Sequence, residues 1–382
     1  MKLSDLVRGT PPSGIRAIYN KIAEAGDVIS LALGEPDGDT PRKCIEAAEK
    51  SFDMRQTHYT PNAGIMDLRV AIAESYGNAS FQPSQVIVAA GATEALLLIC
   101  MTLLNPGDEV IVMEPYWPTY LGQIKAVGAV PHFVRTYEED GFIVRRENLK
   151  AAINDRTKMI LLNSPSNPTG ALMKQEDIEM IASLAIKNDL IVISDEVYHK
   201  MIYDDAPFFS IYDVPGMAGR CLIVDSFSKT YAMTGWRVGY IAAPPDAAKA
   251  LEAMHEYGVS CISEPSQRAA IAALKYGDGF VEQTLESYAK RRAIMTEGLS
   301  GVPGIRCRKP EATFYLYFNV RDTGMTSDEF VYRLLDQQKI AMAPGTAFGD
   351  GQDAYVRLSF ASSEENLQIA IDRVRKFVQQ NQ

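Results

Sequence analysis

A lysine flanked by hydroxyl residues follows a short apolar segment in the second half of the chain. The run Cys221–Val224 is apolar and partly β-branched, which predicts a buried strand of a parallel sheet. Ser226, Ser228 and Lys229 come just after it, at the carboxyl end of the strand, where open α/β sheets bind ligands. A lysine amine placed there can form an imine with a carbonyl compound. Arg237, further along, can supply a fixed positive charge for a phosphate.

A surface lysine beside a loop is the alternative explanation, and the pattern S-x-S-K alone would favour it. The longer segment Ser226–Tyr240 resembles the active-site lysine motif of fold-type-I pyridoxal phosphate (PLP) enzymes, specifically the class I and II aminotransferases. Its form, S-F-S-K-x-x-x-M-T-G-W-R-x-G-Y, is typical of bacterial aspartate and aromatic aminotransferases. The resemblance implies that Lys229 holds PLP as an internal imine. It also implies an α/β fold, with a mainly parallel seven-stranded sheet in a large domain and a smaller α+β domain.

A carboxylate and a tyrosine follow another expected buried strand, Leu190–Ser194. Asp195 can hydrogen-bond the pyridine nitrogen of the cofactor and keep it protonated, which makes the ring a better electron sink. Tyr198, three residues further on, can donate a hydrogen bond to the phenolic oxygen of the cofactor. A helix N-cap is the alternative role for Asp195, but the pattern S-D-E-x-Y in this setting favours the catalytic one.

Asn167 lies in the loop N-x-P-x-N-P-T-G, where two prolines and a glycine fix the backbone. Its amide can therefore be held at a set angle to hydrogen-bond the phenolic oxygen. Trp117 follows the expected strand Glu109–Met113, and an aromatic ring there can stack on the pyridine ring. The family places its stacking residue at this position, whereas a tryptophan of the core is the alternative.

A turn of small residues between a strand and a helix predicts an anion site. The expected strand 85–90 leads into Gly91, Ala92 and Thr93, and the N–H groups and dipole of the following helix attract a phosphate. No G-x-G-x-x-G pattern occurs, which argues against a nicotinamide site. In the family, the tyrosine at Tyr59 reaches the phosphate of the other subunit, although a tyrosine packed on a loop is the alternative. The resemblance therefore implies a phosphate site made by Gly91, Ala92, Thr93, Ser226, Ser228, Arg237 and Tyr59.

Two further segments match the part of the family that binds substrate. The pattern R-L-S-x-A places Arg357 where the family binds the α-carboxylate, and the bidentate fork of arginine suits that task. The turn G-E-P-D brings Gly34 to the same carboxylate, beside Asn167 and Trp117. Without the other motifs, a sheet-surface arginine and an ordinary Gly-Pro turn are the alternatives.

The chain departs from the family in two places. Where relatives often read P-x-G-A-F-Y, Ala312 replaces the glycine, and we expect this to restrict the turn and alter the nearby pocket wall. The stretch 257–265 lacks the arginine with which classical aspartate aminotransferases bind the distal carboxylate. By family position, the nearest residues to the substrate side chain are Ile15, Arg16 and the stretch Val259–Ser263. Arg16 is the one charge among them that could meet a distal carboxylate, and an arginine that faces solvent on the helix is the alternative.

Composition bounds the remaining possibilities. The chain has 382 residues, 47% of them apolar, with a net charge of -10, so a nucleic-acid partner is not expected. Five cysteines without C-x-x-C spacing, and no apolar run of about 18 residues, favour a cytoplasmic protein with reduced thiols and no membrane segment.

We expect a PLP-binding domain at 37–282 and a small domain formed by 1–36 and 283–382. Ser13 is the expected N-cap of a helix over 15–25, and one long helix over 266–299 is expected to link the two domains.

The function that these motifs favour is a PLP-dependent aminotransferase, which moves an amino group from an L-amino acid to a 2-oxo acid by a ping-pong mechanism. The expected acceptor is 2-oxoglutarate or pyruvate, and the expected active unit is a homodimer with shared sites and no metal. A PLP lyase or oxidative PLP enzyme of the same fold is the alternative, although carbon–sulfur lyases usually lack the Trp-Arg pair seen here. A regulator with a fused DNA-binding domain is a third hypothesis, which the acidic composition disfavours.

Overall fold

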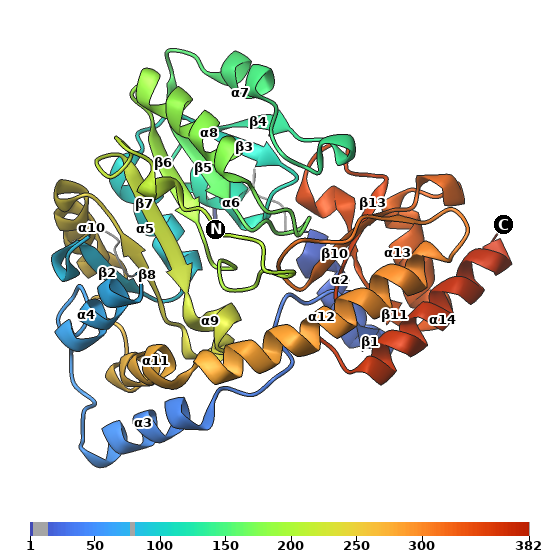
Figure 1. Ribbon diagram of the computed structural model, residues 1–382, viewed down its shortest axis with the longest axis horizontal. Helices are drawn as coiled ribbons and strands as arrows, with labels where there is room; N and C mark the ends of the chain where they lie inside the picture. Colours follow the sequence, from blue (N-terminus) through green and yellow to red (C-terminus); the bar gives the residue numbers. More distant parts are fainter. Residues whose placement is uncertain (3–13, 77–80, 382) are drawn as a thin grey trace.

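The computed structural model describes residues 1–2, 14–76 and 81–381, and a seven-stranded sheet lies at its centre (Figure 1). All neighbouring strands of this sheet are parallel except β8, which runs antiparallel to both of its neighbours. In spatial order the strands are β2 (Val86–Ala89), β8 (Gly239–Ala242), β7 (Cys221–Ser226), β6 (Ile191–Asp195), β5 (Thr157–Asn163), β3 (Glu109–Glu114) and β4 (Val130–Arg135). The mainly parallel seven-stranded sheet predicted from the sequence is therefore confirmed.

Both faces of the sheet are covered by helices, which explains the near-continuous apolar runs of its inner strands. Successive residues of a strand point to opposite faces, so Ile160 and Leu162 enter one buried cluster while Met159 and Leu161 enter the other. The first cluster is covered by α3 (Arg42–Asp53), α4 (Met66–Ser75), α7 (Arg146–Ala152), α8 (Gln175–Lys187) and α11 (Glu264–Tyr276). The second is covered by α5 (Ala92–Leu103), α6 (Thr119–Ala126) and α10 (Pro245–Gly258).

A smaller body with its own buried cluster is built from both ends of the chain. It contains the antiparallel sheet β12 (Ala343–Pro344), β13 (Tyr355–Ser359), β10 (Tyr315–Asn319) and β9 (Arg306–Cys307), and the parallel pair β1 (Ile29–Ser30) and β11 (Ile340–Ala341). Its helices are α2 (Gly14–Ala25), α12 (Asp278–Ser300), α13 (Ser327–Gln338) and α14 (Glu364–Asn381). Figure 1 shows α12 running from beside the large sheet to these elements.

The single long helix expected over 266–299 is wrong, because it is divided at Gly277 into α11 and α12. A Cβ atom at Gly277 would collide with the carbonyl oxygen of Ala273 and lie 2.5 Å from the ring of Tyr231, so a close approach of another segment fixes the break. The apolar segment after Arg237 becomes a strand only from Gly239, since Arg237 has a left-handed backbone with φ of 54°. The N-cap expected at Ser13 lies outside the described residues.

Among the described residues, no helix combines the length and the apolar character needed to cross a membrane. Within the same part of the chain, no cluster of three or more His, Cys, Asp or Glu side chains could hold a metal ion. All five cysteines are free thiols.

Candidate active site

A cavity of about 290 Å³ opens at the carboxyl ends of β5, β6 and β7, where the large sheet meets the smaller body. This is the edge at which a parallel sheet binds ligands. The cavity brings together the predicted cofactor and carboxylate residues except Gly91 and Tyr59, while the side chains of Ile15 and Arg16 lie outside the described part of the chain. Its lining residues are Leu33, Gly34, Ala92, Thr93, Trp117, Tyr120, Asn163, Asn167, Asp195, Val197, Tyr198, Ser226, Ser228, Lys229, Thr234, Arg237, Tyr315 and Arg357.

Lys229 projects into the cavity from the short helix α9 (Phe227–Thr230), which follows β7. Its Nζ donates a hydrogen bond of 2.5 Å to the carbonyl oxygen of Gly34. Burial lowers the pKa of Lys229 to about 8, and the cations of Arg357 and Arg237 act in the same direction. The amine is therefore deprotonated more readily than that of a surface lysine, as a nucleophile or a base requires.

Asp195 ends β6 and is buried, with a side chain that accepts hydrogen bonds from two neighbours. The hydroxyl of Tyr120 donates to Oδ2, and the Val197 N–H lies 3.4 Å from Oδ1. Burial raises the pKa of Asp195 to about 6, and the bond from Tyr120 opposes this shift. Tyr120 was not among the predicted site residues. A signal was present in the sequence, since Tyr120 follows Trp117 by three residues, and the turn in which the Tyr120 N–H donates to the Trp117 carbonyl oxygen at 3.1 Å brings the two side chains together.

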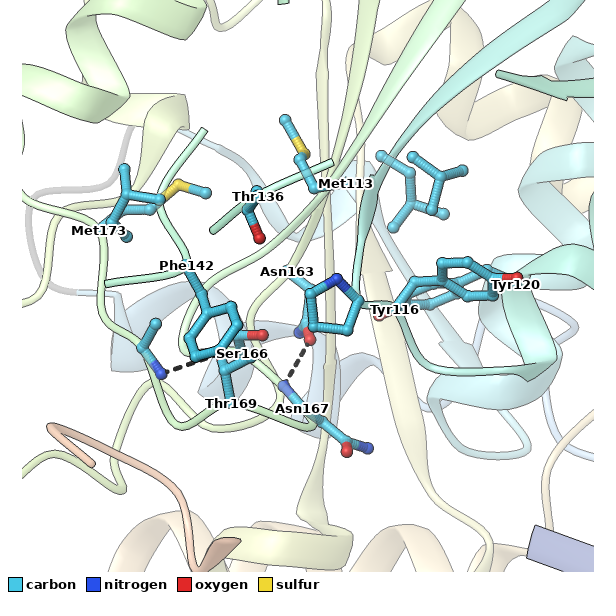
Figure 2. A pocket seen from close by; sticks show the side chains of 15 residues that line it. Met113, Tyr116, Tyr120, Thr136, Phe142, Asn163, Ser166, Asn167, Thr169 and Met173 are labelled. Atoms are coloured by element: carbon cyan, nitrogen blue, oxygen red, sulfur yellow. Dashed lines mark hydrogen bonds between the residues drawn. The ribbon is translucent and has the colours of Figure 1, made fainter. Parts of the chain in front are cut away.

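The asparagine loop is tied to β6 by a second asparagine, which sequence reasoning also left out. Asn163 donates from Nδ2 to the carbonyl oxygen of Asp195 at 3.1 Å, and its Oδ1 accepts from the Asn167 N–H at 2.9 Å. Figure 2 shows Asn163 and Asn167 joined in this way beside a small cavity behind the loop. The two asparagines and Tyr120 line both cavities, so the loop forms the wall between them.

Arg357, on β13, is buried to 2% exposure and is held on three sides. Its Nη1 donates to Asn167 Oδ1 at 2.9 Å and its Nη2 to the Ala32 carbonyl oxygen at 2.6 Å. The guanidinium carbon lies 4.4 Å from the centroid of the Tyr315 ring and 4.8 Å from that of Phe348. Its Nε is buried with no hydrogen-bond partner among the described residues. A fixed cation with an unused donor fits a carboxylate ligand.

This contact also fixes the direction of the Asn167 amide. Because Asn167 Oδ1 accepts from Arg357, its Nδ2 is the atom left to donate into the cavity. On the neighbouring wall, the hydroxyl of Tyr198 lies 2.9 Å from that of Tyr315, and both side chains are buried. Burial raises the pKa of Tyr198 well above its ordinary value, so this phenol keeps its proton and can donate.

Donors suited to an anion gather at the other end of the cavity. Gly91 precedes α5 with a left-handed φ of 81°, and the first N–H groups of that helix point out of its N-terminus. Ser226 Oγ accepts from the Ser228 N–H at 3.1 Å and lies 2.8 Å from Ser228 Oγ. Arg237 Nη2 donates to the Ala90 carbonyl oxygen at 3.1 Å. A Cβ at Gly91 would lie 2.7 Å from that nitrogen, so glycine allows the guanidinium to approach.

Tyr59 lies outside the cavity and is 92% exposed. Trp117 lines the cavity, and its ring packs edge-on against Tyr120, with centroids 5.4 Å apart.

The backbone restriction expected at Ala312 is found at the next residue instead. Thr313 has the left-handed backbone, with φ of 65°, and Ala312 does not. Among the described lining residues, the cations are Lys229, Arg237 and Arg357. The side chains of residues 15 and 16 lie outside the described part of the chain.

The residues present fit a phosphorylated pyridine aldehyde: an amine of lowered pKa, a buried carboxylate, phenol and amide donors, and an anion site next to a separate carboxylate site. Comparison with known proteins agrees with this set. Residues 26–374 match the family model "Aminotransferase class I and II". An aspartate aminotransferase of Pyrococcus abyssi is 39% identical, with 100% of this chain and 99% of that protein covered.

An aromatic-amino-acid aminotransferase of Thermococcus litoralis is 35% identical, with 100% of this chain and 99% of that protein covered. The structure of aspartate aminotransferase from Thermus thermophilus with maleate superimposes with a TM-score of 0.94 at 35% identity, covering 98% of this chain and 99% of that one. These matches span nearly the whole chain. The chain therefore belongs to the class I and II aminotransferases, PLP-dependent enzymes of fold type I that transfer an amino group from an amino acid to a 2-oxo acid.

Proposed function

We propose that Lys229 is the residue that binds the cofactor of this aminotransferase and moves the substrate proton. The observation that carries the proposal is the position of its amine in the cavity, with a pKa lowered to about 8 by burial. When bound, PLP supplies an aldehyde that carries the amino group and a ring that withdraws electrons from the substrate. Lys229 takes the proton from the substrate Cα and returns it to the cofactor carbon that carries the nitrogen.

Borohydride reduction of the purified enzyme tests this role, because it should fix the cofactor on the peptide that contains Lys229. A Lys229→Ala variant should lose turnover while it still binds an amino acid together with the cofactor. Substantial transamination by that variant would sink the assignment.

Four side chains are proposed to hold the pyridine ring. Asp195 accepts a hydrogen bond from the protonated ring nitrogen. Its burial and the hydrogen bond that it accepts from Tyr120 support this role. Trp117 stacks on the ring from its place in the cavity wall. Tyr198 and the free amide nitrogen of Asn167 donate to the phenolic oxygen. Each side chain orients the ring or stabilises its charge, and none needs to move during the reaction.

The phosphate is proposed to bind where the donors of the cavity converge. The residues in this role are Gly91, Ala92, Thr93, Ser226, Ser228, Arg237 and, from the second subunit, Tyr59. We propose a homodimer because Tyr59 lies on a surface rich in exposed apolar side chains, with Met66 54%, Tyr257 84% and Val259 40% exposed. Thr60 Oγ1 lies 3.3 Å from the carbonyl oxygen of Ile262, which places the two segments of this surface side by side.

The dimer is tested by sedimentation of the purified protein across a dilution series. A catalytically competent monomer at assay concentration would contradict it. A Tyr59→Phe variant should retain PLP less well, because it removes one hydrogen bond, worth about 0.5–3 kcal/mol when charge assistance is included.

The substrate α-carboxylate is proposed to bind Arg357, next to Gly34, Asn167 and Trp117. The donor is an L-amino acid and the acceptor 2-oxoglutarate or pyruvate, exchanged in a ping-pong cycle. Curated relatives carry the names aspartate and aromatic-amino-acid aminotransferase. We propose a broad pocket for acidic and neutral side chains, in which Arg16 meets a distal carboxylate. If so, Arg16→Ala should raise KM for aspartate and glutamate alone, and an equal effect on all donors would contradict it.

The division into a PLP-binding domain at 37–282 and a small domain formed by 1–36 and 283–382 stays a proposal. It is supported by the buried cluster of the smaller body, which is separate from the two clusters on the faces of the large sheet. We also propose a cytoplasmic location, which the five free thiols support. Limited proteolysis that releases a fragment ending far from residues 36 and 282 would argue against the domain bounds.

A further inference from the structure

Tyr315 lines the cavity and contacts two of the residues assigned above, yet it has no role in the reaction as described. Its hydroxyl lies 2.9 Å from that of Tyr198, and its ring lies under the guanidinium of Arg357 at 4.4 Å. We propose that Tyr315 is a positioning residue that links the carboxylate-binding Arg357 to the phenol of Tyr198. The inference rests on the proposed roles of those two residues and adds a connection between them.

The surroundings of Tyr315 leave its hydroxyl little freedom. The side chain is 1% exposed, at the first position of β10, and its backbone N–H donates to Thr313 Oγ1 at 3.1 Å. A Cβ atom at Gly34 would collide with the Tyr315 hydroxyl, so the glycine turn closes against it. The hydroxyl is therefore held between the Gly34 turn and Tyr198 and cannot rotate away without moving one of them.

The hydrogen bond between the two tyrosines has a preferred direction once the cofactor is bound. Each phenol carries one proton, and Tyr198 uses its proton on the phenolic oxygen of the cofactor. Tyr198 must then accept from Tyr315, so Tyr315 is the donor of the pair. A hydroxyl that accepts a hydrogen bond becomes a stronger donor itself, and Tyr315 therefore strengthens the bond from Tyr198 to the cofactor.

Arg357 influences the strength of these two hydrogen bonds through its contact with the face of the Tyr315 ring. Burial raises the pKa of Tyr315, and the positive charge of Arg357 against the face of its ring opposes this rise, which makes the hydroxyl a better donor than burial alone would leave it. A substrate carboxylate that binds Arg357 neutralises part of that charge. The occupancy of the carboxylate site is therefore communicated to the cofactor through the ring of Tyr315, in addition to the contact between Arg357 and Asn167.

The test measures the pH midpoint at which the visible absorption band of the bound cofactor changes. A hydrogen bond to the phenolic oxygen stabilises its negative charge and lowers this midpoint. Tyr198→Phe should therefore raise it, and Tyr315→Phe should raise it by a smaller amount of about 0.1–0.7 pH unit, because one hydrogen bond strengthens the next by roughly 10–30%. In the double variant the midpoint should equal that of Tyr198→Phe, because Tyr315 acts only through Tyr198.

A second measurement separates the hydroxyl from the ring. The dissociation constant of maleate, an unreactive dicarboxylate, should be unchanged in Tyr315→Phe, which keeps the aromatic face. It should rise about 2- to 5-fold in Tyr315→Leu, which removes that face from Arg357. Tyr317→Phe is the matched control, since Tyr317 is also buried on β10 and its hydroxyl contacts Gln352 at 3.1 Å, outside the cavity lining. It should change neither quantity.

The outcomes distinguish a failure of the link between Tyr315 and Tyr198 from a failure of the proposed role of Tyr198 itself. If Tyr198→Phe raises the midpoint and Tyr315→Phe does not, the inference is overturned while the proposed role of Tyr198 stands. If the two single variants shift the midpoint additively, Tyr315 acts independently and the link to Tyr198 is wrong. If Tyr198→Phe itself leaves the midpoint unchanged, the proposed role of Tyr198 fails and the inference fails with it.

Discussion

Replacing Tyr120 with phenylalanine should make PLP binding more sensitive to acid. Tyr120 donates to the buried carboxylate of Asp195, whose pKa burial raises to about 6. This bond stabilises the ionised carboxylate, so its loss raises the pKa further. A hydrogen bond to a charged group is worth about 1.5–3 kcal/mol, and one pKa unit corresponds to about 1.36 kcal/mol, so we expect a rise of roughly 1–2 units.

The effect on PLP affinity at neutral pH depends on how much of Asp195 is ionised. The ionised carboxylate is the form that pairs with a protonated ring nitrogen. With a pKa near 6 about nine-tenths of the carboxyl groups are ionised at pH 7. With a pKa of roughly 7–8 that fraction falls to between a half and a tenth. PLP affinity of the Tyr120→Phe apoenzyme should therefore be about 2- to 10-fold weaker at pH 7. The two proteins should become nearly equal at pH 9, where Asp195 is mostly ionised in both.

The assay is a titration of apoenzyme with PLP, followed by absorbance, at several values between pH 5.5 and 9. Titration of PLP itself affects both proteins equally and cancels in their ratio. Tyr116→Phe is the control, because Tyr116 is adjacent in sequence to Trp117 but stacks on Phe133 and does not line the larger cavity. If the affinity of Tyr120→Phe follows pH in the same way as the parent enzyme, the hydrogen bond does not set the charge of Asp195 and the reasoning is refuted.

Three further outcomes are expected. Arg357→Lys should lower kcat/KM for every amino acid by about 10- to 100-fold, because the loss of one charged hydrogen bond affects a carboxylate that all share; a loss confined to one substrate class would contradict this. Gly91→Ala should weaken PLP binding and lower Tm by a few degrees, since the left-handed backbone costs about 1–2 kcal/mol and the methyl group displaces Arg237; unchanged PLP affinity would contradict this. Burial raises the pKa of Glu196 to about 8, so the folded state holds the extra proton and stability falls as pH rises from about 4.5 to 8. Glu196→Gln should flatten this decline in thermal unfolding curves.

The strands that carry the site could be predicted because a parallel sheet buried on both faces leaves near-continuous apolar runs in the sequence. The residues at their carboxyl ends then meet at one edge, which is why Lys229, Asp195 and Asn167 could be placed in one site. Tyr315 could not be found in this way. It reaches Tyr198 across 117 residues of sequence, and no local pattern states which two phenols will touch.

The helix break at Gly277 has a similar origin. The sequence on both sides is helical, and an isolated glycine is tolerated within a helix. A side chain at this position would meet the ring of Tyr231, from the segment just after Lys229, so a glycine is required where the two helices join. Local propensity contains no information on that contact.

The segment from β1 to Ala32 contacts strands β11 and β13, which come more than 300 residues later, and this has a consequence for the synthesis of the enzyme. Ala32, whose carbonyl oxygen binds Arg357, leaves the ribosome 325 residues before its partner. At a synthesis rate of about 5–20 residues per second, this segment waits roughly 20–60 s without its neighbours. Throughout that interval the large sheet can form. The Leu31 carbonyl oxygen, however, has no Ser359 N–H from which to accept a hydrogen bond, and the cavity wall opposite Lys229 is incomplete. The cavity is therefore incomplete until the segment 340–359 has emerged, and until then the edge of β1 has no strand to pair with.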